Sequence, residues 1–363
     1  MMRARIRGLA LVAALAWAAG ARAQPVVAGR VVTDPTAGRV VADTVHSVAL
    51  ERNVFGDSPD RSLLVYLPPS YAQGTRRYPV LYLLHGFGAT ETSWVRGYSG
   101  FNIGTVMDSL IAAGSAREFI IVMPNAKNKV NGSFYTNSAS AGDWDDFVAR
   151  DLVQHIDRKY RTLARPESRG LAGHSMGGFG TFAVGMRHAG DVYSALYSLS
   201  GCCTRFSTDA PRGPTWTRLV ALTSLDSVPR LTFIQQVNLA FAAAFSPNPS
   251  KRPLFVDLPV TLKDTAMVPV AGVLDRWVAN APYDMIPRYR EKLLRLRDFA
   301  FDVGLSDNLV PSATLAAMDS AFTRAGVKHT YETYDGDHTN RVGLRMITRV
   351  LPFFSRTLDF GPQ

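Results

Sequence analysis

The chain has 363 residues, of which 47% are hydrophobic and 19% are charged, so it can bury a sizeable core and is neither disordered nor collagen-like. Its formal net charge is +10, from 40 Lys and Arg against 30 Asp and Glu. The basic residues are scattered, with no run longer than two, which argues against a nucleic-acid partner.

Residues 1–23 have the pattern of a signal peptide. Met1–Arg7 is basic, Leu9–Gly20 is apolar but too short to span a bilayer, and Ala21–Ala23 fits the small-x-small cleavage pattern. We therefore expect an exported protein, periplasmic or secreted, that begins at Gln24 after cleavage. An uncleaved membrane anchor is the alternative. No later stretch reaches about 18 uninterrupted apolar residues, so no membrane span is expected in the mature chain.

Strand and helix patterns alternate along the rest of the chain, after a β-rich N-terminal extension over residues 24–60. The strands are continuous apolar runs, typical of strands buried on both faces of a parallel sheet. Expected strands are Val26–Thr33, Thr44–Leu50, Arg61–Leu67, Tyr78–Leu84, Phe119–Met123, Arg169–Gly173, Tyr193–Leu199, Phe299–Val303 and His329–Tyr334. Expected helices are Ile103–Ala113, Asp143–Tyr160, Gly177–Arg187, Pro311–Ala325 and Thr339–Leu358. The alternation predicts an α/β fold with a mostly parallel sheet and helices on both faces.

Two details of these helices can be predicted. Asp143 is expected to cap the helix that follows it, because Asp side chains accept hydrogen bonds from the first free N–H groups of a helix. The last helix is expected to kink or break at Pro352, because proline lacks the N–H that a helix interior needs.

Residues 204–282 interrupt the alternation. Prolines punctuate this segment, and Arg230–Phe245 is its strong helical candidate. We expect a mainly helical cap inserted into one domain that spans residues 61–363. The segment follows the strand that ends near Ser200, and α/β folds bind ligands at the carboxyl ends of their strands. The cap is therefore expected to form part of the pocket wall and to set chain-length preference; the alternative is a packing extension behind a helix.

The only two cysteines, Cys202 and Cys203, are adjacent. They are interpreted as two buried thiols or, alternatively, as a vicinal disulfide closing a small strained ring. Neither their spacing nor their neighbours suggest a metal site.

The segment Gly173–Gly177 (GHSMG) matches G-x-S-x-G and lies between a predicted strand and a predicted helix. This context is the one in which a serine nucleophile occupies a tight turn, flanked by glycines because side chains there would collide with the backbone. The motif predicts Ser175 as a nucleophile; the alternative is an ordinary surface turn.

A serine hydroxyl needs a base, and His338 is the best of the seven histidines, because it follows a strand and precedes the last helix. The remaining histidines fit less well: His155 and His188 lie on helices, His46 is N-terminal, His329 begins a strand, His174 would point away, and His85 would brace the loop after its strand. Asp307 follows the strand Phe299–Val303 and is expected to orient the imidazole. Asp302 is its main rival, and Asp335 and Asp337 are interpreted as turn residues.

Acyl transfer also needs N–H donors for the developing oxyanion. One is expected from Met176, the residue after the nucleophile. The other is expected from Phe87, in the glycine-flanked loop His85–Gly88 that follows an early strand. Trp94 and Trp144 are weaker candidates for lining a substrate pocket, since aromatic side chains more often pack in a core or at its rim.

The sequence resembles the esterase D group of serine α/β-hydrolases, which includes feruloyl esterases, S-formylglutathione hydrolases, enterochelin-type esterases and mycolyltransferases. The resemblance covers residues 47–205 and 282–358, and 204–282 lacks a family motif. It rests on Val65–Tyr71 (VYLPPSY), Tyr78–Gly86 (YPVLYLLHG), Gly173–Gly178 (GHSMGG), Gly304–Asp307 (GLSD) and Gly336–His338 (GDH). It implies an α/β-hydrolase fold and ester hydrolysis through an acyl-serine, without metal or organic cofactor. The implied triad is Ser175, Asp307 and His338, with oxyanion donors from Phe87 and Met176.

The expected substrate is a small-molecule, glycan or lipid ester. An acyltransferase that passes the same acyl group to a sugar or lipid hydroxyl is the nearest alternative. A catalytically inactive homologue that binds glycans or a protein is a further one. The sequence leaves the oligomeric state open.

Overall fold

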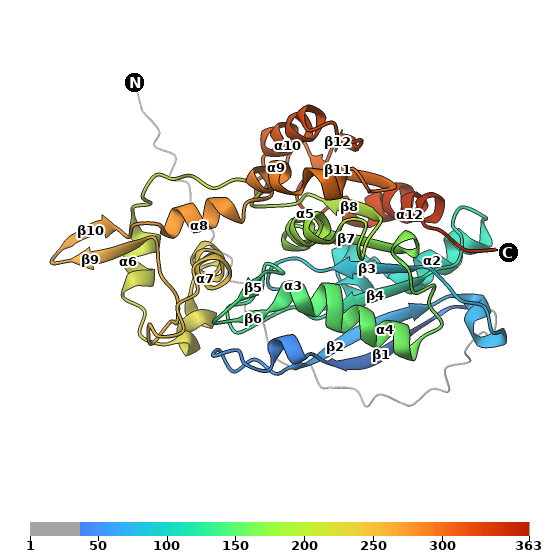
Figure 1. The fold of residues 1–363 in the computed structure, drawn as a ribbon, viewed down its shortest axis with the longest axis horizontal. Helices are drawn as coiled ribbons and strands as arrows, with labels where there is room; N and C mark the ends of the chain where they lie inside the picture. Colours follow the sequence, from blue (N-terminus) through green and yellow to red (C-terminus); the bar gives the residue numbers. More distant parts are fainter. Residues whose placement is uncertain (1–36, 363) are drawn as a thin grey trace, which may run out of the picture. The chain divides into compact units, whose positions relative to one another are not determined.

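An eight-stranded sheet forms the centre of the protein (Figure 1), in the order β1-β2-β4-β3-β7-β8-β11-β12. The computed structural model describes residues 37–362, so the expected signal peptide and the expected strand Val26–Thr33 lie outside the described residues. The strands are β1 (Arg39–His46), β2 (Asp60–Leu67), β3 (Val80–Leu84), β4 (Ile120–Pro124), β7 (Arg169–His174), β8 (Ala195–Leu199), β11 (Asp298–Gly304) and β12 (Thr330–Tyr334). The β1–β2 and β2–β4 pairs are antiparallel and the other pairs are parallel. The sheet is therefore mostly parallel, as the sequence predicts.

The described part of the N-terminal extension belongs to this sheet. All eight residues of β1 pair with β2, from Arg39 opposite Leu67 to His46 opposite Asp60. The segment therefore forms an edge strand of the central sheet.

Helices cover both faces of the sheet, also as predicted. Adjacent side chains of a strand point to opposite faces, and those of β3 accordingly enter two separate hydrophobic cores. One core joins the sheet to α3 (Trp144–Asp146), α4 (Leu152–Lys159), α5 (Met176–His188), α9 (Pro282–Leu293) and α10 (Ser312–Arg324). The other joins it to α1 (Ser93–Arg96), α2 (Ile103–Ala112), α11 (Val342–Arg345) and α12 (Leu351–Thr357).

The prediction that Asp143 caps the N-terminus of the following helix is wrong. Its side chain makes no capping hydrogen bond. Instead, Asn137 Oδ1 accepts from the N–H groups of Asp145 at 2.9 Å and Asp146 at 3.1 Å. Asn137 lies in a short hairpin formed by β5 (Asn137–Ser138) and β6 (Gly142–Asp143). The folding back of this hairpin brings a better-placed acceptor to the helix.

The expected break at Pro352 is also wrong. The helix continues from α11 into α12, and Pro352 is the second residue of α12. The five residues before α12 form a π-helical turn, Met346–Val350. The wider turn changes the hydrogen-bond pattern just before proline, where the ordinary pattern would require an N–H.

Residues 204–281 form α6 (Pro214–Val220), α7 (Phe233–Phe245), α8 (Val273–Ala279) and a hairpin of β9 (Val260–Lys263) with β10 (Ala266–Pro269). They lie beyond β5 and β6 at one end of the sheet (Figure 1). The hairpin was not predicted. The helix α7 begins at Phe233, later than expected, because Thr232 and Gln235 form a reciprocal capping box there. Among the described residues, no helix is long and apolar enough to cross a membrane.

A buried ion pair connects β11 to the last helix. Arg345 Nε donates to Asp302 Oδ2 at 2.7 Å, and the hydroxyl of Tyr197 donates to the same oxygen at 2.9 Å. Arg345 Nη2 also donates to Glu332 on β12, at 2.5 Å. Burial raises the pKa of Asp302 to about 6, against the opposing effect of Arg345. The carboxylate therefore depends on this arginine for its charge balance.

We expect Arg345→Met to lower the free energy of unfolding by about 3 kcal/mol or more, because it leaves Asp302 buried without its counter-charge. Arg349→Met is the matched control: Arg349 also binds Glu332, but its side chain is 49% exposed, so its loss should cost less than about 1 kcal/mol. Urea unfolding curves of both variants measure the difference. Equal losses of unfolding free energy in the two variants would show that Asp302 does not depend on Arg345 for its charge balance.

Candidate active site

Ser175 lies in the turn between β7 and α5, with φ 59° and ψ −114°. Close backbone approach explains the glycines around it. A Cβ on Gly173 would lie 2.4 Å from the carbonyl oxygen of Gly177, and a Cβ on Gly177 would lie 2.3 Å from that of Leu84. No side chain fits at either position, so the motif is a packing requirement of the strained turn that exposes Ser175.

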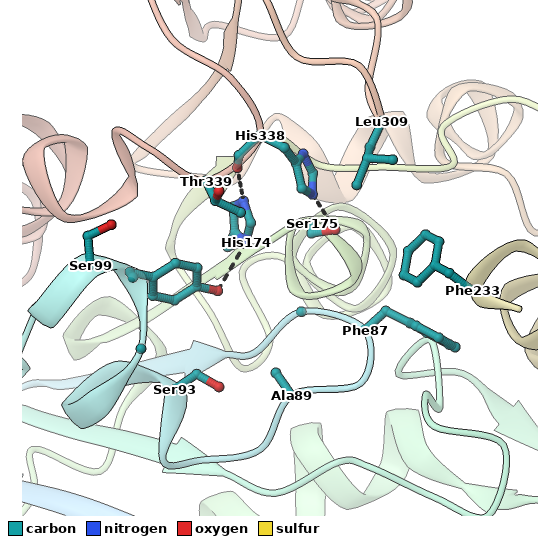
Figure 2. Close-up of a pocket in the computed structure, with 13 residues that line it drawn as sticks. Phe87, Ala89, Ser93, Ser99, His174, Ser175, Phe233, Leu309, His338 and Thr339 are labelled. Carbon is teal, nitrogen blue, oxygen red and sulfur yellow. Dashed lines mark hydrogen bonds between the residues drawn. The ribbon is translucent and has the colours of Figure 1, made fainter. Parts of the chain in front are cut away.

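Three side chains form a hydrogen-bonded chain at this turn. His338 Nε2 is 2.9 Å from Ser175 Oγ (Figure 2), and His338 Nδ1 is 2.8 Å from Asp307 Oδ2. The other oxygen of Asp307 accepts from the N–H groups of Leu309 at 2.9 Å and Val310 at 2.8 Å. Burial alone would raise the pKa of Asp307, but the hydrogen bonds from His338 and the two N–H groups outweigh it and lower the pKa. A fixed negative charge therefore faces the imidazole.

The rival acids have other partners. Asp302 binds Arg345 and Tyr197, as described above, and lies within β11. Asp337 accepts from the N–H groups of Thr339 and Asn340 and so shapes the turn that carries His338. Four of the other histidines bind carboxylates elsewhere: His46 with Asp60, His155 with Asp43, His188 with Asp145 and His329 with Asp319. The structure thus brings together Ser175, His338 and Asp307, the three residues singled out from the sequence.

The expected oxyanion donors border the same space. Among residues 37–362, the N–H groups of Phe87 and Met176 donate no hydrogen bond, so both are free to donate to a ligand. His85 lies behind the Phe87 loop, where Nδ1 binds the carbonyl oxygen of Gly86 at 2.8 Å and Nε2 binds the N–H of Ala126 at 2.9 Å. It therefore fixes the loop from its buried side, as expected from its position.

A pocket of about 440 Å³ opens over Ser175. Figure 2 shows Phe233 and Leu309 on one side of the serine and Ser99 on the other, with Phe87 and Ala89 beneath. The side of the pocket formed by Phe87, Phe233 and Leu309 is apolar, whereas hydroxyl groups gather on the opposite side.

The expectation that Trp94 and Trp144 line this pocket is wrong. Both side chains are completely buried, and they belong to the two different hydrophobic cores. Trp94 packs on Tyr98, with ring centroids 4.9 Å apart, and the indole N–H of Trp144 donates to the carbonyl oxygen of Ala141 at 2.7 Å. Tyr98 reaches the pocket in place of Trp94.

The inserted segment contributes Phe233 to the pocket wall. This first residue of α7 contacts Phe87 edge-to-face, with centroids 5.7 Å apart and an interplanar angle of 89°. Other apolar side chains of the segment, Leu231, Phe241 and Phe245, are buried in the core behind it. The cap therefore touches the site through the N-terminal end of one helix.

Sequence reasoning missed several pocket residues. Tyr98 and Ser99 have φ values of 45° and 58°, and such left-handed residues in a non-periodic loop give no pattern to recognise. Leu309 lies two positions after Asp307 and could have been proposed, because both leave the sheet at the same edge.

Cys202 and Cys203 are free thiols in the structure, with their sulfur atoms 2.7 Å apart. Both are partly buried. Across residues 37–362, no group of three or more His, Cys, Asp and Glu side chains could hold a metal ion.

A nucleophile turn after a central strand, with acid and base on loops at the same edge of a mostly parallel sheet, defines an α/β-hydrolase fold. The family model described as "Putative esterase" matches residues 58–342, and the chain belongs to this esterase family.

Individual proteins named as esterases are also similar to parts of this chain. An endo-1,4-beta-xylanase/feruloyl esterase of Xylanibacter ruminicola is 37% identical over 128 residues, which is 34% of this chain and 17% of the relative. An esterase of Mycobacterium tuberculosis is 33% identical over 135 residues, which is 36% of this chain and 27% of the relative. The chain thus spans only a small part of the length of these relatives. The structure of a ferulic acid esterase superposes with a TM-score of 0.63 at 23% identity, over 89% of this chain and 99% of that one.

Two buried histidines should make the fold sensitive to acid. Burial lowers the pKa of His85 to about 4 and that of His174 to about 3, compared with about 6.5 in an unfolded chain. Below pH 6.5 the unfolded chain therefore binds more protons than the folded one, so stability falls as the pH falls. Each histidine should remove about 2 kcal/mol from the free energy of unfolding between pH 7.5 and pH 5.

Urea unfolding of the wild type and of His85→Gln at both pH values measures this effect. The variant should lose about 2 kcal/mol less than the wild type between the two pH values, because the other titrating groups are common to both proteins. An identical loss in the two proteins would show that His85 does not titrate as its burial implies.

Proposed function

We propose that the protein is a serine esterase in which Ser175 attacks the carbonyl carbon of a carboxylic ester. The observation that carries the proposal is the unbroken chain from Ser175 Oγ to His338 Nε2 (2.9 Å) and from His338 Nδ1 to Asp307 (2.8 Å). Membership of the esterase family supports the same reaction class.

The geometry suggests the role of each group. His338 takes the proton of Ser175 Oγ as the oxygen bonds to the carbonyl carbon, and it later gives this proton to the departing alcohol. The Asp307 carboxylate stabilises the imidazolium that exists between the two transfers. The free N–H groups of Phe87 and Met176 donate hydrogen bonds to the oxyanion. In the second half of the reaction, His338 takes a proton from the attacking water and returns it to Ser175 Oγ as the acyl-serine bond breaks.

The pocket favours an aromatic acyl group. Phe87 and Phe233 present a right-angled pair of rings beside Ser175, and Leu309 adds an apolar surface on the same side of the pocket. A flat ring inserted there gains both apolar burial and aromatic contacts. Two of the proteins similar to this chain are named as feruloyl or ferulic acid esterases. We therefore propose hydroxycinnamoyl esters, with a glycan as the alcohol, as the substrate class.

Replacing the nucleophile tests the reaction class. Ser175→Ala should fold normally and lose activity on p-nitrophenyl esters by a factor on the order of 10⁴ or more, as removal of a catalytic serine does elsewhere. Ser93→Ala is the matched control, because Ser93 lines the same pocket but its hydroxyl donates to the carbonyl oxygen of Thr90 at 2.7 Å. A tenth of wild-type activity left in Ser175→Ala would refute the proposal.

The same assay separates hydrolysis from acyl transfer. Methyl ferulate, acetylated xylan and a siderophore ester are each tested with and without an added alcohol. Product that appears only with the alcohol would indicate an acyltransferase built on the same acyl-serine.

The aromatic wall is tested at Phe233. We expect Phe233→Ala to raise KM for methyl ferulate about tenfold and to change KM for p-nitrophenyl acetate much less, because acetate is too short to reach the ring. Ile234→Ala is the control: this neighbouring side chain is 52% exposed and does not line the pocket. Equal effects of Phe233→Ala on both esters would contradict the proposed aromatic preference.

A further inference from the structure

The imidazole of His174, directly before Ser175, is buried and bonded through both of its nitrogens (Figure 2). Its Nε2 is 2.7 Å from the carbonyl oxygen of His338, and its Nδ1 is 3.0 Å from the hydroxyl oxygen of Tyr98. The rings of His174 and His338 lie next to each other, with centroids 4.7 Å apart. His174 therefore links Tyr98, which lines the pocket, to the backbone of His338.

The partners determine where the protons lie. A carbonyl oxygen can only accept a hydrogen bond. Nε2 of His174 therefore carries a proton and donates a hydrogen bond to the carbonyl oxygen of His338. Burial lowers the pKa of His174 to about 3, so the ring is neutral and its Nδ1 has no proton. The hydroxyl of Tyr98 must then donate to Nδ1. The direction of both hydrogen bonds is thus fixed: Tyr98 to His174, and His174 to His338.

This link adds to the contacts that hold the loop of His338, in which the N–H of Ser306 donates to the carbonyl oxygen of Gly336 at 3.0 Å. His338 lies in the loop between β12 and α11. On one side of it, the Asp337 carboxylate accepts from the N–H groups of Thr339 and Asn340. Within residues 37–362, His174 is the only donor found for the carbonyl oxygen of His338. Without it, no hydrogen bond from the described residues would hold this carbonyl group.

The turn that supplies Tyr98 is strained. Tyr98, Ser99 and Gly100 have consecutive φ values of 45°, 58° and 86°. Two non-glycine residues in this region are costly, and such strain persists where the surrounding structure holds it. Here the strained turn places the Tyr98 hydroxyl against His174, and both Tyr98 and Ser99 line the pocket.

We propose that His174 and Tyr98 are positioning residues for the esterase reaction, which hold the His338 peptide so that its imidazole reaches Ser175 and Asp307 together. The inference rests on the proposed function, because it assigns His338 as the base. Neither residue exchanges a proton with the substrate. Their effect is on alignment, to which catalysis is sensitive: a displacement of about 1 Å can cost on the order of 100-fold in rate.

The test compares kcat and KM for p-nitrophenyl acetate in three variants. His174→Leu keeps a buried side chain but cannot donate, and its kcat should fall about 10- to 100-fold with KM within about twofold. His174→Gln can still donate an amide N–H to His338 and should recover most of that loss. Tyr98→Phe removes only the hydroxyl and should lower kcat about 3- to 10-fold.

Two remote residues provide matched controls. The Tyr193 hydroxyl donates to the carbonyl oxygen of Val148 at 3.0 Å, and His329 Nδ1 binds that of Val327 at 2.8 Å. Tyr193→Phe and His329→Leu therefore also remove a hydrogen bond to a backbone carbonyl, and both should keep kcat within twofold of wild type. A general loss of packing would lower kcat in the controls as well and would overturn the inference.

The outcomes separate this inference from the proposed function. If Ser175→Ala, assayed alongside, retains turnover, the proposed function fails and the positioning role fails with it. If Ser175→Ala is inactive but folded His174→Leu keeps kcat within twofold of wild type, only the positioning role is wrong. A His174→Gln variant no better than His174→Leu would also overturn it. Should His174→Leu not fold, an unchanged kcat in Tyr98→Phe is sufficient to refute the link.

Discussion

The site depends on a backbone contact that only glycine permits. At the end of β7 the chain turns so sharply that Gly173, Gly177 and the carbonyl group of Leu84 lie closer together than a Cβ atom would allow. The turn leaves Ser175 in a left-handed conformation that costs about 1–3 kcal/mol. The surrounding structure supplies this energy, because α5 is buried along nearly its whole length between the central strands and the outer helices.

A second glycine contact brings Asp307 and His338 together. The strands β11 and β12 are parallel, with Gly304 opposite Tyr334, so the loops that follow them leave the sheet side by side. A Cβ on Gly304 would lie 2.2 Å from the carbonyl oxygen of Gly336, so the two loops pack directly on each other. The Asp302–Arg345 ion pair fixes the same strand to the helix after His338. Parallel topology and close loop packing thus bring Asp307 within reach of His338.

Much of this arrangement follows from the sequence, because it depends on short-range patterns. Buried parallel strands read as apolar runs, and a serine motif between a strand and a helix has few structural interpretations. Features that depend on contacts between distant segments were not predictable. Asn137 replaces Asp143 as the helix cap only because a hairpin folds back, and Trp94 is covered by packing that no local pattern records. Phe233 reaches the pocket because the capping box of Thr232 and Gln235 starts α7 at this residue.

The inserted segment is attached to the loop before α3 at several points. Asn131 Nδ2 donates to Gln236 Oε1 at 2.7 Å, Ser138 Oγ donates to the carbonyl oxygen of Ala243 at 2.5 Å, and the ring of Phe134 packs against Phe241. A rigid swing of α7 would break these contacts and expose an aromatic core. The segment is therefore a fixed wall. The position of Phe233 at the pocket is therefore set by the packing of the whole segment and not by a movable flap.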